Sequence, residues 1–362
     1  MPTLTGSARA TTPLPIQVQP VFDPKPWGSR RLASLCGELP DGLIGEALLT
    51  ISSAQVASGP DFGQTLGDMA TASPQHWCGE QGLRATQGRA IFPLLIKFID
   101  AKDTLSVQVH PDDALAAARG LGFGKTEAWR ILEAAPNAVV YAGLRDGVQG
   151  EEFQAACREQ GDVSGYLNAI PARAGMTVVI PAGTVHAIGG GLLIYEIQQP
   201  SNVTFRLNDW GRLDERGNPR DLHHGDGREA LKPHLYPQPV TPVRVADERV
   251  VLAATQYFAL EHVEMPSSRA LTLPPVQSPQ VLTVLQGVVE ASLRGVPGSV
   301  VARSGETWIA PAGSVVTLVA GTQVALLRGW VPDLEEDIVA PARAAGIGNE
   351  LLAQLGLETV IS

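Results

Sequence analysis

The residues best suited to chemistry begin in the segment Ser106-Val107-Gln108-Val109-His110-Pro111-Asp112. The segment predicts a short strand, which the proline ends by removing a backbone donor. Side chains alternate between the two faces of a strand, so Ser106, Gln108 and His110 share one face. A hydroxyl, an amide and an imidazole therefore line one surface. Such a row is either a hydrogen-bonded core network or part of a functional site.

Two later segments offer partners for this row. Lys125 and Glu127 precede Trp129 on a second predicted strand, and the alternation of side chains aligns the cation and the acid on one side. His186 follows a Pro-Ala-Gly turn at 181–183 and begins a third predicted strand. All three strands belong to one β-rich unit of the chain.

Gln108, His110, Glu127 and His186 together provide an amide oxygen, two imidazoles and a carboxylate. Metal sites need ligands on rigid elements, which strands supply. Two histidines, one carboxylate and a neutral oxygen, with room for water, suit a catalytic Zn²⁺, although Fe, Mn and Co also bind such sets. The remaining histidines lack comparable strand contexts and are expected to be surface or structural residues: His76, His223, His224, His234 and His262.

The composition limits the class of protein that carries these residues. A chain of 362 residues predicts about two domains, and 38 glycines and 28 prolines favour short strands and turns over long helices. We therefore expect a mainly β fold with a few helices in the connections. The net charge of −10, without a basic stripe, excludes nucleic acid and anionic membranes as partners. A phosphorylated metabolite remains possible, because a few local lysines and arginines suffice to bind it.

The cysteines and the hydropathy pattern predict a cytoplasmic protein. Cys36, Cys78 and Cys157 are odd in number and form no CxxC pair, which fits a reducing compartment better than a disulfide framework. No run approaches the roughly 18 apolar residues of a membrane span, and we expect no signal peptide at the N-terminus.

Several other segments carry local predictions. The apolar run 91–101 predicts a strand, and Lys97 within it either marks an edge position or faces a partner or ligand anion. Residues 24–28 are rich in turn formers and favour a surface loop pinned by Trp27 over a binding loop. A short helix is expected near residues 66–71, and helical connections over 150–170.

The chain also contains a degenerate internal repeat. Residues 305–316 match residues 175–186 at a constant offset of 130, and Val316 stands at the position of His186. The first copy is therefore expected to hold the chemistry and the second to support it. The predicted organisation is a flexible tail (1–15), a metal-binding domain (16–245), a metal-free second domain (246–332) and a C-terminal helical tail (333–362).

Four motifs bear a resemblance to a known family: Ser-Val-Gln-Val-His-Pro at 106–111, Gly-Lys-Thr-Glu at 124–127, Pro-Ala-Gly-Thr-Val-His-Ala-Ile at 181–188 and Asn-Val-Thr-Phe-Arg at 202–206. In this order, they resemble the signature motifs of type I mannose-6-phosphate isomerases of the short bacterial form. The similarity spans roughly residues 17–331. It implies a cupin fold of two jelly-roll units, without the helical insertion of the longer family members.

The resemblance also implies roles for particular residues. It implies one zinc ion per chain, with ligands matching the four residues named above. Lys97 and Lys125 match lysines placed at the substrate, Arg206 matches an arginine regarded as catalytic, and Ser106 matches a serine near the sugar phosphate. Asn202 stands where many relatives have an aspartate, and it joins the candidate substrate-binding residues.

The activity implied is the interconversion of D-mannose 6-phosphate and D-fructose 6-phosphate through a cis-enediol. Zinc would act as a Lewis acid, and Arg206 and Lys125 would add fixed positive charge. A zinc-bound hydroxide, a neutral lysine or a histidine could serve as the base. Two alternatives are a cupin oxidoreductase that uses Fe(II) and a non-catalytic cupin that binds a sugar phosphate. The chain is expected to be a monomer or a homodimer.

Overall fold

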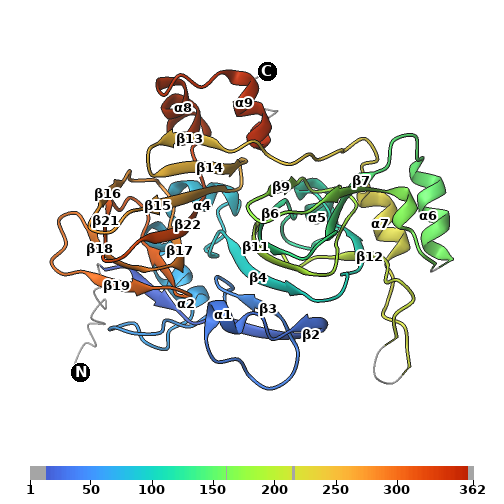
Figure 1. Ribbon diagram of the computed structural model, residues 1–362, viewed down its shortest axis with the longest axis horizontal. Helices are drawn as coiled ribbons and strands as arrows, with labels where there is room; N and C mark the ends of the chain where they lie inside the picture. The colour runs from blue at the N-terminus through green and yellow to red at the C-terminus, as the bar shows by residue number, and fades with distance from the viewer. Residues whose placement is uncertain (1–13, 160, 214–216, 358–362) are drawn as a thin grey trace, which may run out of the picture.

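The structure, a computed structural model, describes residues 14–159, 161–213 and 217–357. It is mainly β, as the composition predicted, and its strands form four antiparallel sheets (Figure 1). The predicted flexible tail lies outside the described residues up to residue 13, and so does the C-terminal stretch 358–362.

The N-terminal half of the chain builds a pair of sheets whose strands and flanking loops carry all the candidate site residues. The six-stranded sheet has the order β2 (Val21–Ser29), β3 (Ile44–Leu48), β4 (Leu95–Ala101), β11 (Leu192–Gln198), β6 (Glu127–Ala134) and β9 (Thr177–Ile180). The five-stranded sheet has the order β12 (Phe205–Asn208), β5 (Val107–Val109), β10 (His186–Ile188), β7 (Val139–Leu144) and β8 (Leu167–Pro171).

The C-terminal half builds a second pair of sheets. The seven-stranded sheet has the order β1 (Ile16–Val18), β20 (Thr307–Ala310), β17 (Gln280–Gln286), β22 (Val324–Trp330), β15 (Ala259–Met265), β14 (Arg249–Ala254) and β13 (Val243–Ala246). The four-stranded sheet has the order β16 (Ala270–Leu273), β21 (Val316–Ala320), β18 (Val288–Leu293) and β19 (Val300–Arg303). Strand β1 comes from the N-terminal part of the chain and pairs with β20.

The two pairs of sheets share one topology. The order β3-β4-β11-β6-β9 in the first pair corresponds to β14-β15-β22-β17-β20 in the second, and β5-β10-β7-β8 corresponds to β16-β21-β18-β19. His186 begins β10 and Val316 begins the equivalent β21. The internal duplication predicted from the offset of 130 is thus present in the strand order.

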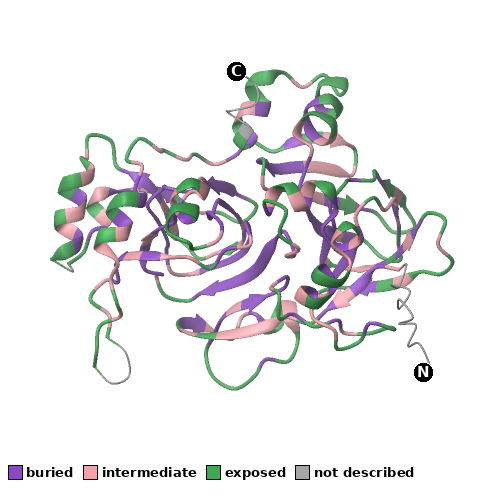
Figure 2. Cartoon of the chain, turned by 180° about the vertical axis from the view of Figure 1, so that it is seen from behind, coloured by how far each residue is buried: buried purple, intermediate pink, exposed green. Residues whose placement is uncertain are grey.

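Apolar clusters bind the four sheets into a stack. One cluster fills the space between the six- and five-stranded sheets, and a second fills the space between the seven- and four-stranded sheets. The largest cluster lies between the six- and seven-stranded sheets and joins the two halves. Figure 2 shows this burial along the central strands. The side chains of β4, β6 and β11 therefore alternate between the joint of the two halves and the interior of the first pair.

The α-helices are short and lie in the connections between strands or, for α8 and α9, after the last strand. Their bounds are α1 (Ala33–Cys36), α2 (Leu66–Ala72), α3 (Pro74–Trp77), α4 (Gly79–Ala85), α5 (Asp113–Ala118), α6 (Gly150–Arg158), α7 (His224–Ala230), α8 (Ala340–Ala344) and α9 (Asn349–Leu352). The predicted helix near 66–71 is confirmed as α2. Helix α6 and helix α7 cover the outer face of the five-stranded sheet. Residues 334–357 are largely helical.

Two local predictions are wrong. Residues 24–28 are not a surface loop: they belong to β2, which carries an irregularity between Pro24 and Ser29. A Cβ on Gly28 would lie 2.5 Å from the backbone nitrogen of Gly45, so only glycine permits this approach of β2 to β3. Residues 150–170 are not all helical, because Leu167 and Ile170 bury their side chains on strand β8 beside β7.

In the described part of the chain, no helix is long and apolar enough to cross a membrane.

Candidate metal centre and its pocket

Three of the four predicted metal ligands meet in the interior of the first pair of sheets. His110 follows β5 directly, Glu127 begins β6 and His186 begins β10. Their side chains are almost completely buried. The Nε2 atoms of His110 and His186 each lie 3.4 Å from one oxygen of Glu127, and the potential ligand atoms all lie within 4.8 Å of one another.

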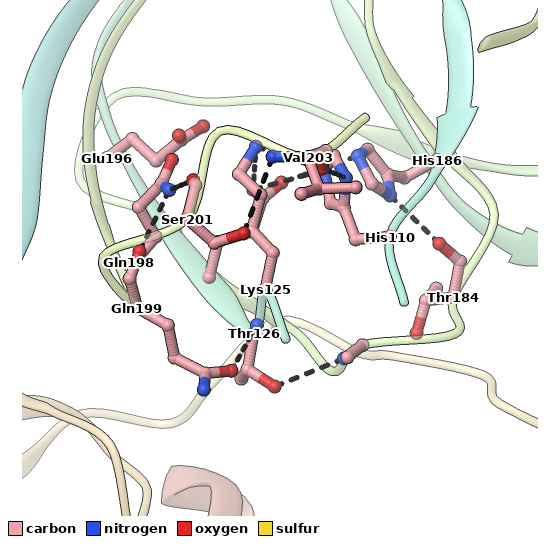
Figure 3. A network of polar contacts seen from close by, with 12 residues as sticks. His110, Lys125, Thr126, Thr184, His186, Glu196, Gln198, Gln199, Ser201 and Val203 are labelled. Carbon is pink, nitrogen blue, oxygen red and sulfur yellow. Dashed lines mark hydrogen bonds and ion pairs between the residues drawn. The ribbon is translucent and has the colours of Figure 1, made fainter. Parts of the chain in front are cut away.

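Backbone carbonyls fix the orientation of both imidazoles. The Nδ1 atom of His110 donates to the carbonyl of Val203 at 2.9 Å, and that of His186 donates to the carbonyl of Thr184 at 2.9 Å (Figure 3). Since a carbonyl only accepts, Nδ1 carries the proton in both rings and Nε2 keeps its lone pair. This is the arrangement in which a histidine binds a metal through Nε2.

The protonation states of the three residues also suit a cation. Burial, together with the charge of Lys125, lowers the pKa of His110 to about 3, and burial lowers the pKa of His186. Burial raises the pKa of Glu127, but Lys125 and the two imidazoles outweigh it and hold that pKa well below its ordinary value. At neutral pH the cluster therefore offers two neutral imidazoles and a carboxylate, the forms that bind a metal.

Unpartnered buried atoms support the same conclusion. Among the described residues, neither carboxylate oxygen of Glu127 nor Nε2 of His186 has a partner in hydrogen-bond geometry. The ammonium of Lys125 lies 3.0 Å from Glu127 as an ion pair and 3.1 Å from Nε2 of His110. Buried polar atoms without partners are costly, so the cluster fits a divalent cation that would satisfy them.

Gln108 lies beside this cluster. On the five-stranded sheet it stands directly opposite His186 on β10 and opposite Arg206 on β12. Residues opposite one another on neighbouring strands present their side chains to the same face. The amide of Gln108 is therefore placed between the metal cluster and Arg206.

A cavity of about 350 Å³ opens beside the cluster. It is lined by all the remaining candidate residues of the sequence prediction, namely Lys97, Ser106, Lys125, Asn202 and Arg206, together with Gln108. Lys25, a further candidate cation for the phosphate, also lines it, and so do five residues with polar or aromatic side chains that were not predicted: Trp27, Glu46, Glu196, Thr204 and Arg220. A larger cavity of about 620 Å³ lies at the C-terminal tail and contains none of the candidate residues.

Lys97 faces carboxylates in the cavity. It lies on the central strand β4, with Nζ 3.3 Å from Glu46 and 3.2 Å from Glu196. Of the two interpretations left open by the sequence, the edge position is therefore wrong and the partnered position is confirmed. Burial opposes the charge of Lys97, but the carboxylates of Glu196, Glu46 and Glu127 outweigh it and raise its pKa.

Glu196 is the most buried of the residues that sequence reasoning missed. It accepts a hydrogen bond from Nε1 of Trp129 at 2.9 Å, and its Oε1 has no hydrogen-bond partner among the described residues apart from the ion pair with Lys97. Burial and the neighbouring charge of Glu127 raise its pKa, against the opposing effect of Lys97. The available signal was a single acid within the apolar run 192–198.

Arg206 is half-buried at the cavity wall. Its Nη1 donates to the backbone carbonyl of Asp221 at 2.9 Å, and its Nε has no hydrogen-bond partner in the described ranges. The backbone nitrogen of Arg206 donates to Nδ1 of His223 at 3.1 Å, which gives this histidine a structural role. No described carboxylate lies within ion-pair distance of Arg206, which lines the cavity.

The comparisons with known proteins agree with this geometry. A family model described as the catalytic domain of type I phosphomannose isomerase matches residues 43–137. A Bacillus subtilis protein named "Probable mannose-6-phosphate isomerase GmuF" is 33% identical over 282 residues, which are 75% of this chain and 86% of that protein. A mannose-6-phosphate isomerase from Streptococcus mutans is 35% identical over 58% of this chain and 65% of its own length.

Solved structures resemble the whole fold. The crystal structure of the mannose 6-phosphate isomerase from Bacillus subtilis superimposes with a TM-score of 0.76 and 26% identity, covering 87% of this chain and 99% of that one. A variant of phosphomannose isomerase from Salmonella typhimurium superimposes with a TM-score of 0.68 at 16% identity, covering 88% of this chain and 100% of that one, a likeness of fold.

Proposed function

Because the chain belongs to the type I phosphomannose isomerase family, we propose that it interconverts D-mannose 6-phosphate and D-fructose 6-phosphate with a bound zinc ion. The observation that carries this proposal is the position of the buried His110, Glu127 and His186 cluster beside a cavity lined by lysines and arginines. A metal site next to cationic side chains suits a substrate with a hydroxyl-carbonyl end and a phosphate end.

The proposed metal ligands are His110, Glu127, His186 and the amide oxygen of Gln108. Two imidazoles, a carboxylate and a neutral oxygen match the donors of catalytic zinc sites. When bound, the metal would supply Lewis-acid polarisation of the oxygens at C1 and C2 of the sugar. We propose that residues 16–245 carry this activity, and that residues 246–332 form a metal-free supporting domain.

The chain's own residues would stabilise negative charge and carry a proton. Interconversion moves a proton between C2 and C1 through a cis-enediol, and negative charge develops on the sugar oxygens. Lys125 and Arg206 would stabilise that charge in a site with little water. Glu196 would carry the proton, because it is a carboxyl group that lines the cavity and its Oε1 has no hydrogen-bond partner among the described residues.

Other cavity residues would bind and orient the substrate. Lys97, held between Glu46 and Glu196, presents a fixed ammonium to the sugar. Ser106 and Asn202 line the same cavity with a hydroxyl and an amide, which can hydrogen-bond to sugar hydroxyls or to the phosphate. The three free cysteines fit a cytoplasmic enzyme.

The test is an isomerase assay with purified protein, with and without chelator, followed by addition of zinc. We expect activity with mannose 6-phosphate, its loss on chelation and its recovery with zinc under anaerobic conditions. A requirement for oxygen and iron would support the oxidoreductase instead. Binding of the sugar phosphate without exchange of its C2 proton with solvent would identify a non-catalytic binding protein.

A further inference from the structure

The connection between β12 and α7 brings to the cavity a cation that the proposed mechanism does not use. Arg220 lines the cavity that also contains Arg206, Ser106 and Asn202. We propose that Arg220, oriented by Asp209, binds the phosphate group of the substrate and so selects phosphorylated sugars over free sugars. This assignment rests on the proposed function, because it names the part of the sugar phosphate that Arg220 would bind.

Asp209 holds the guanidinium of Arg220 in one orientation. Nε of Arg220 donates to Oδ2 of Asp209 at 2.7 Å, and its Nη2 donates to Oδ1 at 2.5 Å. Asp209 is 6% exposed and directly follows β12, so the anchor itself is rigid. Nη1 of Arg220 has no hydrogen bond within the described part of the chain. A planar guanidinium fixed along one edge keeps its other donors for a second anion.

The neighbourhood of Arg206 supplies a reason for an anion to bind here. Arg206 and Arg220 line one cavity, and Arg206 has no carboxylate partner among the described residues. Burial and then the charge of Arg220 lower the pKa of Arg206, the sign of two cations close enough to repel. A phosphate dianion bound to Arg220 would offset this repulsion and accept charge-assisted hydrogen bonds from the free donors of Arg220.

The position of Arg220 suits the far end of a hexose phosphate. His186, Gln108 and Arg206 stand opposite one another on β10, β5 and β12, and neighbouring strands lie about 4.8 Å apart. The backbone of Arg206 is therefore about 10 Å from that of His186. Strand β12 is the edge strand of its sheet, and Arg220 lies in the connection that follows it. A sugar with C1 and C2 near the metal cluster would extend its phosphate toward this edge.

Arg212 provides a matched control for Arg220. It also pairs with Oδ1 of Asp209, at 2.5 Å, and its side chain is 27% exposed against 28% for Arg220. Arg212 donates a further hydrogen bond to the carbonyl of Thr104 and does not line the cavity. The two arginines therefore share charge, exposure and anchor, and they differ in access to the substrate.

The experiment compares Arg220→Gln and Arg212→Gln in the zinc-loaded enzyme. We expect Arg220→Gln to raise KM for mannose 6-phosphate about ten- to a hundredfold, the effect of losing a charged hydrogen bond, with a smaller change in kcat. The inhibition constant of inorganic phosphate should rise by a similar factor. Arg212→Gln should leave both constants within about threefold of the wild type. Asp209→Asn, which loosens the anchor, should raise KM by an intermediate factor.

Equal effects of the two glutamine variants, or unchanged phosphate inhibition in Arg220→Gln, would overturn the assignment. Thermal melting checks that each variant is folded, and Arg220→Lys, which retains the charge, replaces the glutamine variant if that protein does not fold. Calorimetric titration with inorganic phosphate separates this proposal from the proposed function. Phosphate binding that depends on Arg220, in a zinc-loaded protein without isomerase activity, would refute the proposed function and leave the phosphate site intact.

Discussion

Replacement of Lys97 by methionine should destabilise the protein strongly at neutral pH. The ammonium lies between Glu46 and Glu196 at 3.3 and 3.2 Å, and the Lys97 side chain is 11% exposed. Methionine keeps most of the volume but leaves two acids without their shared cation. Removing one partner of a buried ion pair costs about 3–5 kcal/mol. Because Glu46 is 13% exposed and retains some water, we expect about 3 kcal/mol at pH 7.

The pH dependence of this loss has a definite sign. The pKa of Glu196 is already raised by burial and by Glu127 in the wild type, and loss of the Lys97 charge would raise it further. A carboxyl whose folded pKa lies above its unfolded pKa destabilises the folded state above that pKa, and the penalty disappears as the pH falls through it. The difference between Lys97→Met and the wild type should therefore shrink as the pH falls toward 5.

Urea unfolding of the chelator-treated proteins measures these differences. Lys97→Met/Glu196→Gln should be more stable than Lys97→Met, because the amide removes the unpaired charge and can still accept the hydrogen bond from Trp129. Lys102→Met, at an exposed position after the same strand, should change stability by less than about 0.5 kcal/mol. A loss below about 1 kcal/mol in Lys97→Met at pH 7, or a double variant less stable than the single one, would refute this account of the charges.

Three further predictions concern the metal, the cavity and the fold. His186→Ala should lose both bound metal and activity, and a chelator should lower the melting temperature of the wild type but not of this variant; wild-type metal content in His186→Ala would contradict the ligand assignment. Arg206→Ala should keep its metal while kcat falls about 10²- to 10³-fold in the isomerase assay, and metal loss would contradict separate roles. Gly28→Ala should lower the free energy of unfolding by about 1–3 kcal/mol, because its Cβ would meet the Gly45 backbone; an unchanged urea midpoint would show that the strands can separate there.

Part of the candidate metal cluster could be predicted because the information that pairs Gln108 with His110 is local. Gln108 and His110 stand two residues apart, and their shared face follows from alternation alone. The contrast between His186 and Val316 in the two copies of the repeat then indicated which copy carries chemistry. The strand order and the distances among His110, Glu127 and His186 agree with that reasoning.

Contacts between distant strands could not be predicted in the same way. Glu196 stands directly opposite Lys97 on neighbouring strands, 99 positions apart in the sequence, and each residue alone looks like one charge in an apolar run. Residues 24–28 form part of a strand rather than a loop because Gly28 on β2 packs closely against Gly45 on β3. Arg220 reaches the cavity through a long connection. Such pairings depend on the register of the whole sheet, which no single segment specifies.

The second pair of sheets shows which side chains occupy the positions that correspond to the candidate site. The strand registers of the two pairs of sheets can be matched position by position. Gln280 then stands at the position of Glu127, Arg328 at that of Glu196, and Glu261 at that of Lys97. Leu273 and Val316, which lie opposite each other, stand at the positions of Gln108 and His186.

In the second unit the polar groups satisfy one another. Arg328 donates to Gln280 at 2.9 Å and to Glu261 at 3.3 Å, and none of these three side chains is among the described buried groups without a partner. In the first unit the oxygens of Glu127 and Oε1 of Glu196 lack such hydrogen bonds. The corresponding polar side chains are thus hydrogen-bonded to one another in the second unit, whereas in the first unit some of their atoms have no hydrogen-bond partner. We propose that the unsatisfied polar atoms give the first unit its capacity to bind a ligand, since a fully hydrogen-bonded network has no donor or acceptor left for a metal or a sugar.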